Sequence, residues 1–146
     1  MSRWLGVDYG DRRVGFAVSD PSGMIASPAG FLVRRAGKRA PVKAIITRAA
    51  ELGAEAFVLG LPLDGNGDET ARCAEVRVIA SQLEARTGLP VRLVDERFTT
   101  AKAHRIIREM GGSTRGRKGD VDALAAVVLL EFALATASNA NSNANE

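Results

Sequence analysis

The sequence has very little cysteine and histidine and no long apolar run. It holds one residue of each among 146, which excludes an internal disulfide framework and a Cys-rich zinc site. The longest apolar stretch, residues 123–130, is far shorter than the roughly 20 residues of a membrane span. The first ten residues lack a long apolar segment and already contain Asp8, so they do not resemble a secretory signal. These absences predict a cytoplasmic protein that does not contact membranes.

Lysine is also scarce. Of the 20 basic residues, four are lysine and 16 are arginine, and the formal net charge is +3. A guanidinium group suits bidentate contacts with phosphate, so this bias favours a nucleic-acid partner. The alternative is a genomic base composition that enriches arginine and alanine together, and composition alone leaves both open. Aromatic residues make up only 5% of the chain, which disfavours recognition by base stacking.

The order of apolar patterns and turn residues predicts one α/β domain. Alternating or short apolar runs predict strands at 4–9, 14–19, 25–33 (broken near Pro28), 56–59 and 91–94. Apolar residues at helical spacing predict four helices, beginning near Pro41, near Cys73, at Thr99 or Thr100, and at Asp120 as the cap. Such an order predicts a mixed five-stranded sheet, antiparallel at the N-terminus and then parallel, with helices on both faces. It is the element order of the ribonuclease H-like fold.

The domain is expected to span residues 1–137. The last residues, 138–146, read SNANSNANE and contain no large apolar side chain. Because such a segment has little apolar surface to bury, we expect a disordered tail.

Three acidic positions lie at the ends of different predicted elements. Asp8 ends the first strand, on the same face as Trp4 and Gly6, although a role in the hairpin turn explains it equally well. Asp95 and Glu96 follow the last strand, and the alternation of a strand allows at most one of them to share a face with Asp8.

Asp122 is the third acid, and we expect it in the first turn of the last helix, where a carboxylate also favours the helix dipole. Sites in α/β sheets form at the carboxyl edges of the strands. Carboxylates gathered there are suitable ligands for Mg²⁺, and two such ions can stabilise the attacking and leaving oxygens of a phosphoryl displacement.

Four blocks of sequence resemble the YqgF-type family in the same order and spacing. Its members are described as Holliday junction resolvases and as nucleases that process the 5′ end of precursor 16S ribosomal RNA. The blocks lie within residues 4 to about 135 and read LGVDYGDRRVGFAVSD, VLGLPLDGNGDET, VDERFTTAKA and KGDVDALAAVVLLE.

The resemblance implies a ribonuclease H-like nuclease that depends on Mg²⁺ or Mn²⁺ in a two-metal mechanism. It implies that Asp8, Glu96 and Asp122 are the catalytic, metal-binding acids, with Glu96 preferred to Asp95 as the middle residue of the family's Asp-Glu-Arg triplet. It places Arg97 next to a phosphate. Products with 5′-phosphate and 3′-hydroxyl ends are also implied.

Basic residues elsewhere supply candidate contacts with the phosphate backbone of precursor rRNA or branched DNA. Ordinary solvated loops are the alternative explanation for them. The candidates are Arg13, Arg34, Arg35, Lys38, Arg39, Arg97, Arg115, Arg117 and Lys118.

The loop at residues 64–68 departs from the family pattern and resembles part of a calcium-binding loop. Asp64, Asn66 and Asp68 occupy its positions 1, 3 and 5, but Glu69 replaces the required glycine and no helix precedes the loop, which argues against calcium.

Two other functions fit parts of the sequence. One is a non-catalytic nucleic-acid-binding module of ribosome assembly, with structural acids. The other is an actin-like phosphotransferase, although these use two lobes and this chain has the length of one. The residues leave a monomer and a homodimer equally open.

Overall fold

The fold is a five-stranded sheet with helices on both faces, as predicted. The computed structural model describes residues 2–35, 39–97, 102, 105–106, 108–109 and 118–144, with the side chains of 118, 119 and 137–144 outside that description. In chain order the elements are β1 (Trp4–Tyr9), β2 (Arg13–Ser19), β3 (Ala26–Val33), α1 (Val42–Glu51), β4 (Ala56–Leu61), α2 (Ala71–Thr87), β5 (Val91–Asp95) and α4 (Lys118–Ala144).

The strand order is β3-β2-β1-β4-β5. β1 pairs antiparallel with β2 and parallel with β4, so the change from antiparallel to parallel pairing occurs at β1. β3 extends the antiparallel half at one edge, and β5 extends the parallel half at the other. The mixed sheet of the sequence analysis is confirmed.

β3 continues through Pro28, but its pairing with β2 is irregular just after it: between the pairs Ala17–Pro28 and Gly15–Phe31, β3 has one residue more than β2. The expected interruption near Pro28 is therefore a shift in register within one edge strand, where the missing N–H of a proline need not interrupt a second ladder.

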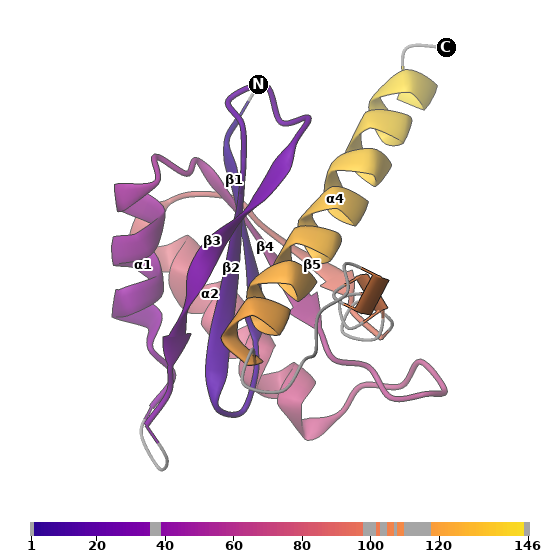
Figure 1. Ribbon diagram of the computed structural model, residues 1–146. Coiled ribbons are helices and arrows are strands. Elements are labelled where there is room, and N and C mark those ends of the chain that lie inside the picture. The colour runs from indigo at the N-terminus through magenta and orange to yellow at the C-terminus, as the bar shows by residue number, and fades with distance from the viewer. Residues whose placement is uncertain are drawn as a thin grey trace.

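The two faces of the sheet are covered by different helices. α1 and α2 lie on one face, and α4 crosses the other (Figure 1). Large apolar side chains fill the α1–α2 side, among them Leu5, Val7 and Phe57. A smaller cluster under α4 includes Ala17, Val58 and Leu130.

The helices end as the sequence indicates, except at the C-terminal end. α2 stops at Gly88, whose φ of +72° gives the left-handed cap that glycine adopts readily. α4 begins at Lys118, so Asp120 lies in its first turn instead of capping it, and Asp122 lies one residue beyond that turn. The backbone of α4 continues to Ala144, since no glycine or proline interrupts the segment expected to be a tail. Of the predicted third helix, residues 102, 105–106 and 108–109 are described and are helical, and its other residues lie outside the described part of the chain.

None of the helices in the described part of the chain combines the length and apolarity needed to cross a membrane.

Candidate functional site

Asp8 and Glu96 lie on the α4 face of the sheet, at its carboxyl edge. Asp8 is near the end of β1, opposite Gly15 of β2. Glu96 follows β5, and its carboxylate lies against the α-carbon of Gly60 at the end of β4, where an added Cβ would overlap it. Glycine at position 60 therefore leaves the space that Glu96 occupies. The carboxyl ends of β1, β4 and β5 and the start of α4 all lie in the lower part of Figure 1.

The two carboxyl groups are coupled. The pKa of Asp8 is raised to about 6, mainly by burial. A hydrogen bond from Glu96 opposes this rise, and the charge of Asp122 adds to it. Burial, followed by the charge of Asp8 and the hydrogen bond to it, raises the pKa of Glu96 to about 9. The raised pKa of Glu96 favours its neutral form, in which it donates the hydrogen bond to Asp8. Burial is the main cause of both shifts, so a cation bound beside the two groups would favour their ionised forms.

Asp122 reaches the same face from α4. Its backbone carbonyl lies so close to the α-carbon of Gly15 that a side chain there would overlap it, so α4 and β2 meet at this glycine. The Asp122 side chain accepts a hydrogen bond of 2.6 Å at Oδ2 from Nε of Arg13. Folding thus brings together three acids that are far apart in the sequence.

Asp95, the neighbour of Glu96, takes a different role. Its carboxylate pairs with Arg97 at 2.7 Å and also accepts a hydrogen bond from the Arg97 backbone N–H. Strand alternation separates the two acids, as predicted, and the structure assigns Glu96 to the face of Asp8.

The predicted substrate-binding residues divide into several groups. Arg13 is in the site, paired with Asp122, and Arg97 lies beside it, paired with Asp95. Arg34 packs over the ring of Tyr9 and donates a hydrogen bond to the carbonyl of Gly10 in the β1–β2 turn.

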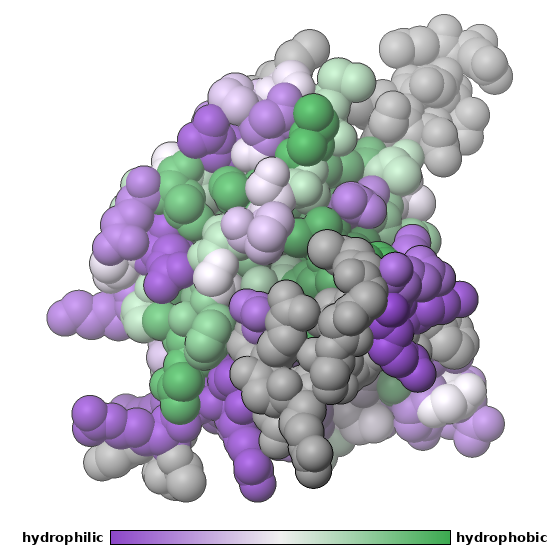
Figure 2. Space-filling view, viewed as in Figure 1, coloured by the Kyte–Doolittle hydropathy of each residue, from purple (hydrophilic) through white to green (hydrophobic). Residues whose placement is uncertain are grey.

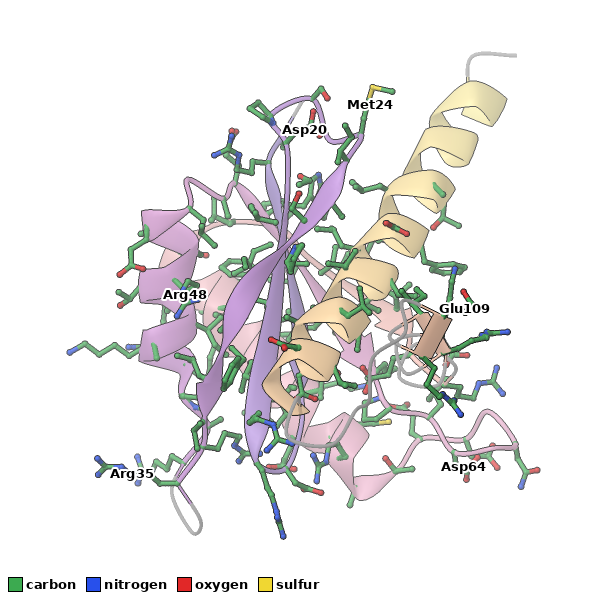
Figure 3. The ribbon with its side chains drawn as sticks, in the orientation of Figure 1. Asp20, Met24, Arg35, Arg48, Asp64 and Glu109 are labelled. Carbon is green, nitrogen blue, oxygen red and sulfur yellow. The ribbon has the colours of Figure 1, made fainter. Side chains whose placement is uncertain are left out.

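Arg35 and Arg39 are exposed, and Figure 3 shows Arg35 at the lower end of the molecule, pointing away from the body. Hydrophilic side chains project from this end in Figure 2. Lys38, Arg115, Arg117 and the Lys118 side chain lie outside the described residues.

A family model described as "RuvX: Holliday junction resolvase" matches residues 2–136. The chain belongs to the RuvX family. This assignment confirms the family resemblance seen in the four sequence blocks.

RuvX relatives with the name "Putative pre-16S rRNA nuclease" match most of the chain. One from Clavibacter michiganensis subsp. michiganensis is 40% identical over 94% of this chain and 86% of its own length. One from Nocardioides sp. is 42% identical over 90% of this chain and 86% of its own. Both the family description and the relatives' names are those of nucleases.

A solved structure shares the fold of this RuvX member. Thermus thermophilus RuvC in complex with a Holliday junction substrate superimposes with a TM-score of 0.55 at 16% identity, over 94% of this chain and 96% of that one. At this identity the similarity establishes the ribonuclease H-like fold.

Arg72 is a member of the site that the sequence analysis missed. It lies at the start of α2, pairs with Asp11 of the β1–β2 turn, and its charge lowers the pKa of Glu96. The sequence did contain a signal for Arg72: α2 begins just after the loop that follows the carboxyl end of β4, so its first residues lie near the site. The glycines at 15 and 60 were missed as well, since their importance depends on neighbours from other elements.

The loop that departs from the family pattern is closed by its own hydrogen bonds. Oδ1 of Asp64 accepts from the backbone N–H groups of Asn66 and Asp68, and the Asp64 N–H donates to the Asp68 carbonyl. Figure 3 shows Asp64 on the loop beyond β4, directed toward solvent. These contacts give Asp64 a structural role in the turn.

The donor set fits a hard divalent cation, although the side chains do not yet converge on one. Asp8, Glu96 and Asp122 offer carboxylate oxygens, the ligands that Mg²⁺ and Mn²⁺ prefer. Within the described part of the chain, no group of three acidic, cysteine or histidine side chains is arranged to hold a metal. One Asp122 oxygen, Oδ2, is engaged by Arg13.

Proposed function

We propose that this chain is a nuclease that depends on Mg²⁺ or Mn²⁺ and hydrolyses phosphodiester bonds of structured nucleic acid. The observation that carries the proposal is the buried pair of Asp8 and Glu96 on the face that Asp122 also reaches. Precursor 16S rRNA and the Holliday junction are the substrates to test, because relatives and the family model bear those names.

Asp8, Glu96 and Asp122 would hold the metal. A bound divalent cation supplies charge stabilisation for the attacking and leaving oxygens of the displaced phosphoryl group. Its charge would also favour loss of the proton that Glu96 holds, since opposite charge stabilises the ionised carboxyl group.

Arginines around the acids would position the substrate. Arg97 lies next to Glu96 and is paired with the exposed Asp95, so its guanidinium remains close to solvent. Arg35 and Arg39 are exposed and would contact the phosphate backbone away from the cleaved bond. Such contacts bind without reading the base sequence, which suits a substrate recognised by its shape.

The test is cleavage by the wild type and by Asp8→Asn, with precursor 16S rRNA and a four-way DNA junction, each with and without Mn²⁺. We expect metal-dependent cleavage that leaves 5′-phosphate and 3′-hydroxyl ends. Asp8→Asn should lower the rate by about 100-fold or more and leave nucleic-acid binding intact. Binding without cleavage on every substrate would instead identify a non-catalytic assembly module, and undiminished cleavage by Asp8→Asn would exclude Asp8 from the site.

A further inference from the structure

Asp122, the third acid of the proposed site, forms an ion pair with Arg13. Nε of Arg13 donates to Oδ2 of Asp122 at 2.6 Å, and both side chains are about a quarter exposed, at 24% and 23%. The two residues are 109 positions apart, so the contact is made by the fold and not by the local chain.

The backbone of Asp122 is held in place by packing, whereas its side chain is partly exposed. Its carbonyl is packed against the α-carbon of Gly15, which fixes α4 against β2 at this residue. Asp8 is the cross-strand partner of Gly15, so Asp122 packs against the residue opposite Asp8. The Asp122 carboxylate therefore has the Arg13 guanidinium as its partner and lies on the same face of the sheet as Asp8 and Glu96.

We propose that Arg13 is an exchangeable counter-ion: it holds Asp122 while the metal is absent, and gives up this carboxylate when a divalent cation binds beside Asp8 and Glu96. The released guanidinium is then available to the phosphate of the bound nucleic acid. The inference rests on the function proposed above and assigns Arg13 a positioning role in it. It follows that Arg13 weakens metal binding and strengthens substrate binding.

The sign of the effect separates this role from a structural one. If Arg13 only kept Asp122 in place, removing it would weaken metal binding. If Arg13 competes with the metal for the same carboxylate, removing it tightens metal binding. The pair is partly exposed, so the competition should change the affinity by about two- to fivefold.

The experiment measures Mn²⁺ binding calorimetrically on the full chain without nucleic acid. Arg13→Gln should bind Mn²⁺ about two- to fivefold more tightly than the wild type. Arg12→Gln is the matched control, because Arg12 is the exposed preceding residue of the same hairpin and the substitution removes the same charge. It should change the affinity less than about twofold, since a solvent-exposed charge without a partner in the site is screened.

A double-mutant cycle tests whether the effect passes through Asp122. In an Asp122→Asn background, Arg13→Gln should leave Mn²⁺ affinity unchanged, because the competing pair no longer exists. Thermal melts of each variant establish that it is folded. Weaker or unchanged binding by Arg13→Gln, or an equal gain in the Asp122→Asn background, would overturn the proposal.

The substrate side gives a second measurement. With Mn²⁺ at saturation, Arg13→Gln should raise KM for the nucleic acid more than it lowers kcat. A fall in kcat with unchanged KM would overturn the second half of the proposal.

The same titrations distinguish failure of this inference from failure of the proposed function. Wild-type binding that is absent, or that Asp8→Asn leaves unchanged, would overturn both. Binding that Asp8→Asn abolishes, together with weaker binding by Arg13→Gln, would overturn the role of Arg13 alone.

Discussion

The two faces of the sheet are built from the same strands, but one packs large apolar side chains and the other carries the acidic site. On β1, Leu5 and Val7 face α1 and α2 and are fully buried in an apolar cluster. The intervening Gly6 faces α4, where a Cβ would crowd the carbonyl of Ala126, and Asp8 faces the same way. β4 repeats the pattern, with Leu59 in the apolar cluster and Gly60 under the Glu96 carboxylate.

The comparison shows how one strand can carry both stability and a polar site. Large side chains on the α1–α2 face contribute most of the apolar burial, while small ones on the α4 face let helix backbone and a carboxylate approach the sheet closely. The polar site is therefore expected to cost stability, and the opposite face to compensate for it. Substitutions on each face should separate these effects.

The largest effect is expected from Glu96→Gln, which keeps the shape of the side chain and prevents its ionisation. Cleavage in the substrate assay should fall by about 100-fold or more, because one of the acids that would hold the metal is neutralised. The circular dichroism spectrum should stay that of the wild type. Retention of at least half of the wild-type rate would mean that the α4 face does not depend on this acid.

Leu59→Ala should produce the largest loss of stability. Leu59 is fully buried, so its truncation removes apolar contacts and leaves a cavity that costs about 2–5 kcal/mol. Urea unfolding measures the change. Below the unfolding transition, the rate of cleavage per folded molecule should stay close to that of the wild type, in contrast to Glu96→Gln.

Gly15→Ala and Gly60→Ala should differ because their new methyl groups meet different obstacles. At position 15 the methyl group meets the backbone of Asp122, so α4 must shift, at a cost of about 1–3 kcal/mol. At position 60 it meets the Glu96 side chain, which can rotate away, so stability should change less and cleavage should be lost. Urea unfolding and the cleavage assay together measure the contrast, and equal destabilisation by the two variants would contradict it.

The stability of the metal-free protein should fall as pH rises from about 4.5 to about 9. Over this range Glu96 keeps its proton in the folded state, with a pKa of about 9, but loses it in the unfolded chain, where 4.5 is the ordinary value. The folded state thus binds more protons, and each rise in pH favours unfolding. Glu96→Gln removes this titration, so at pH 8 it should exceed the wild type by at least about 1 kcal/mol, the value of roughly one pKa unit.

Urea unfolding at a series of pH values, with a chelator present, measures both slopes. Parallel slopes for the wild type and Glu96→Gln would show that this carboxyl group is not protonated in the folded state.

Asp95→Asn should have the smallest effect and serves as the control for Glu96→Gln. It breaks a partly exposed ion pair with Arg97, worth about 0–1 kcal/mol. Cleavage should fall much less than with Glu96→Gln, although the two residues are adjacent. Loss of cleavage comparable to that of Glu96→Gln would place both acids in the site.

Much of the fold could be predicted because its signals are local. Alternating apolar residues located β1 and β2, and glycines ended helices where the chain has to turn. The predicted bounds of the last helix differ from those of α4, which starts two residues before Asp120 and continues past residue 137. The alanine and asparagine residues after 137 neither require a helix nor end one. The roles of the site residues stay predictions.

The sequence by itself determined the order of the elements and the face of β1 on which Asp8 lies. It also determined that only one of Asp95 and Glu96 can share that face, because strand alternation is a local property of the backbone. Only the tertiary structure decided that Glu96 meets Asp8, that Arg72 acts on the site and that Arg13 holds Asp122. Those contacts join residues from separate elements. Their distances depend on how α2, α4 and the sheet pack, which no local pattern of residues specifies.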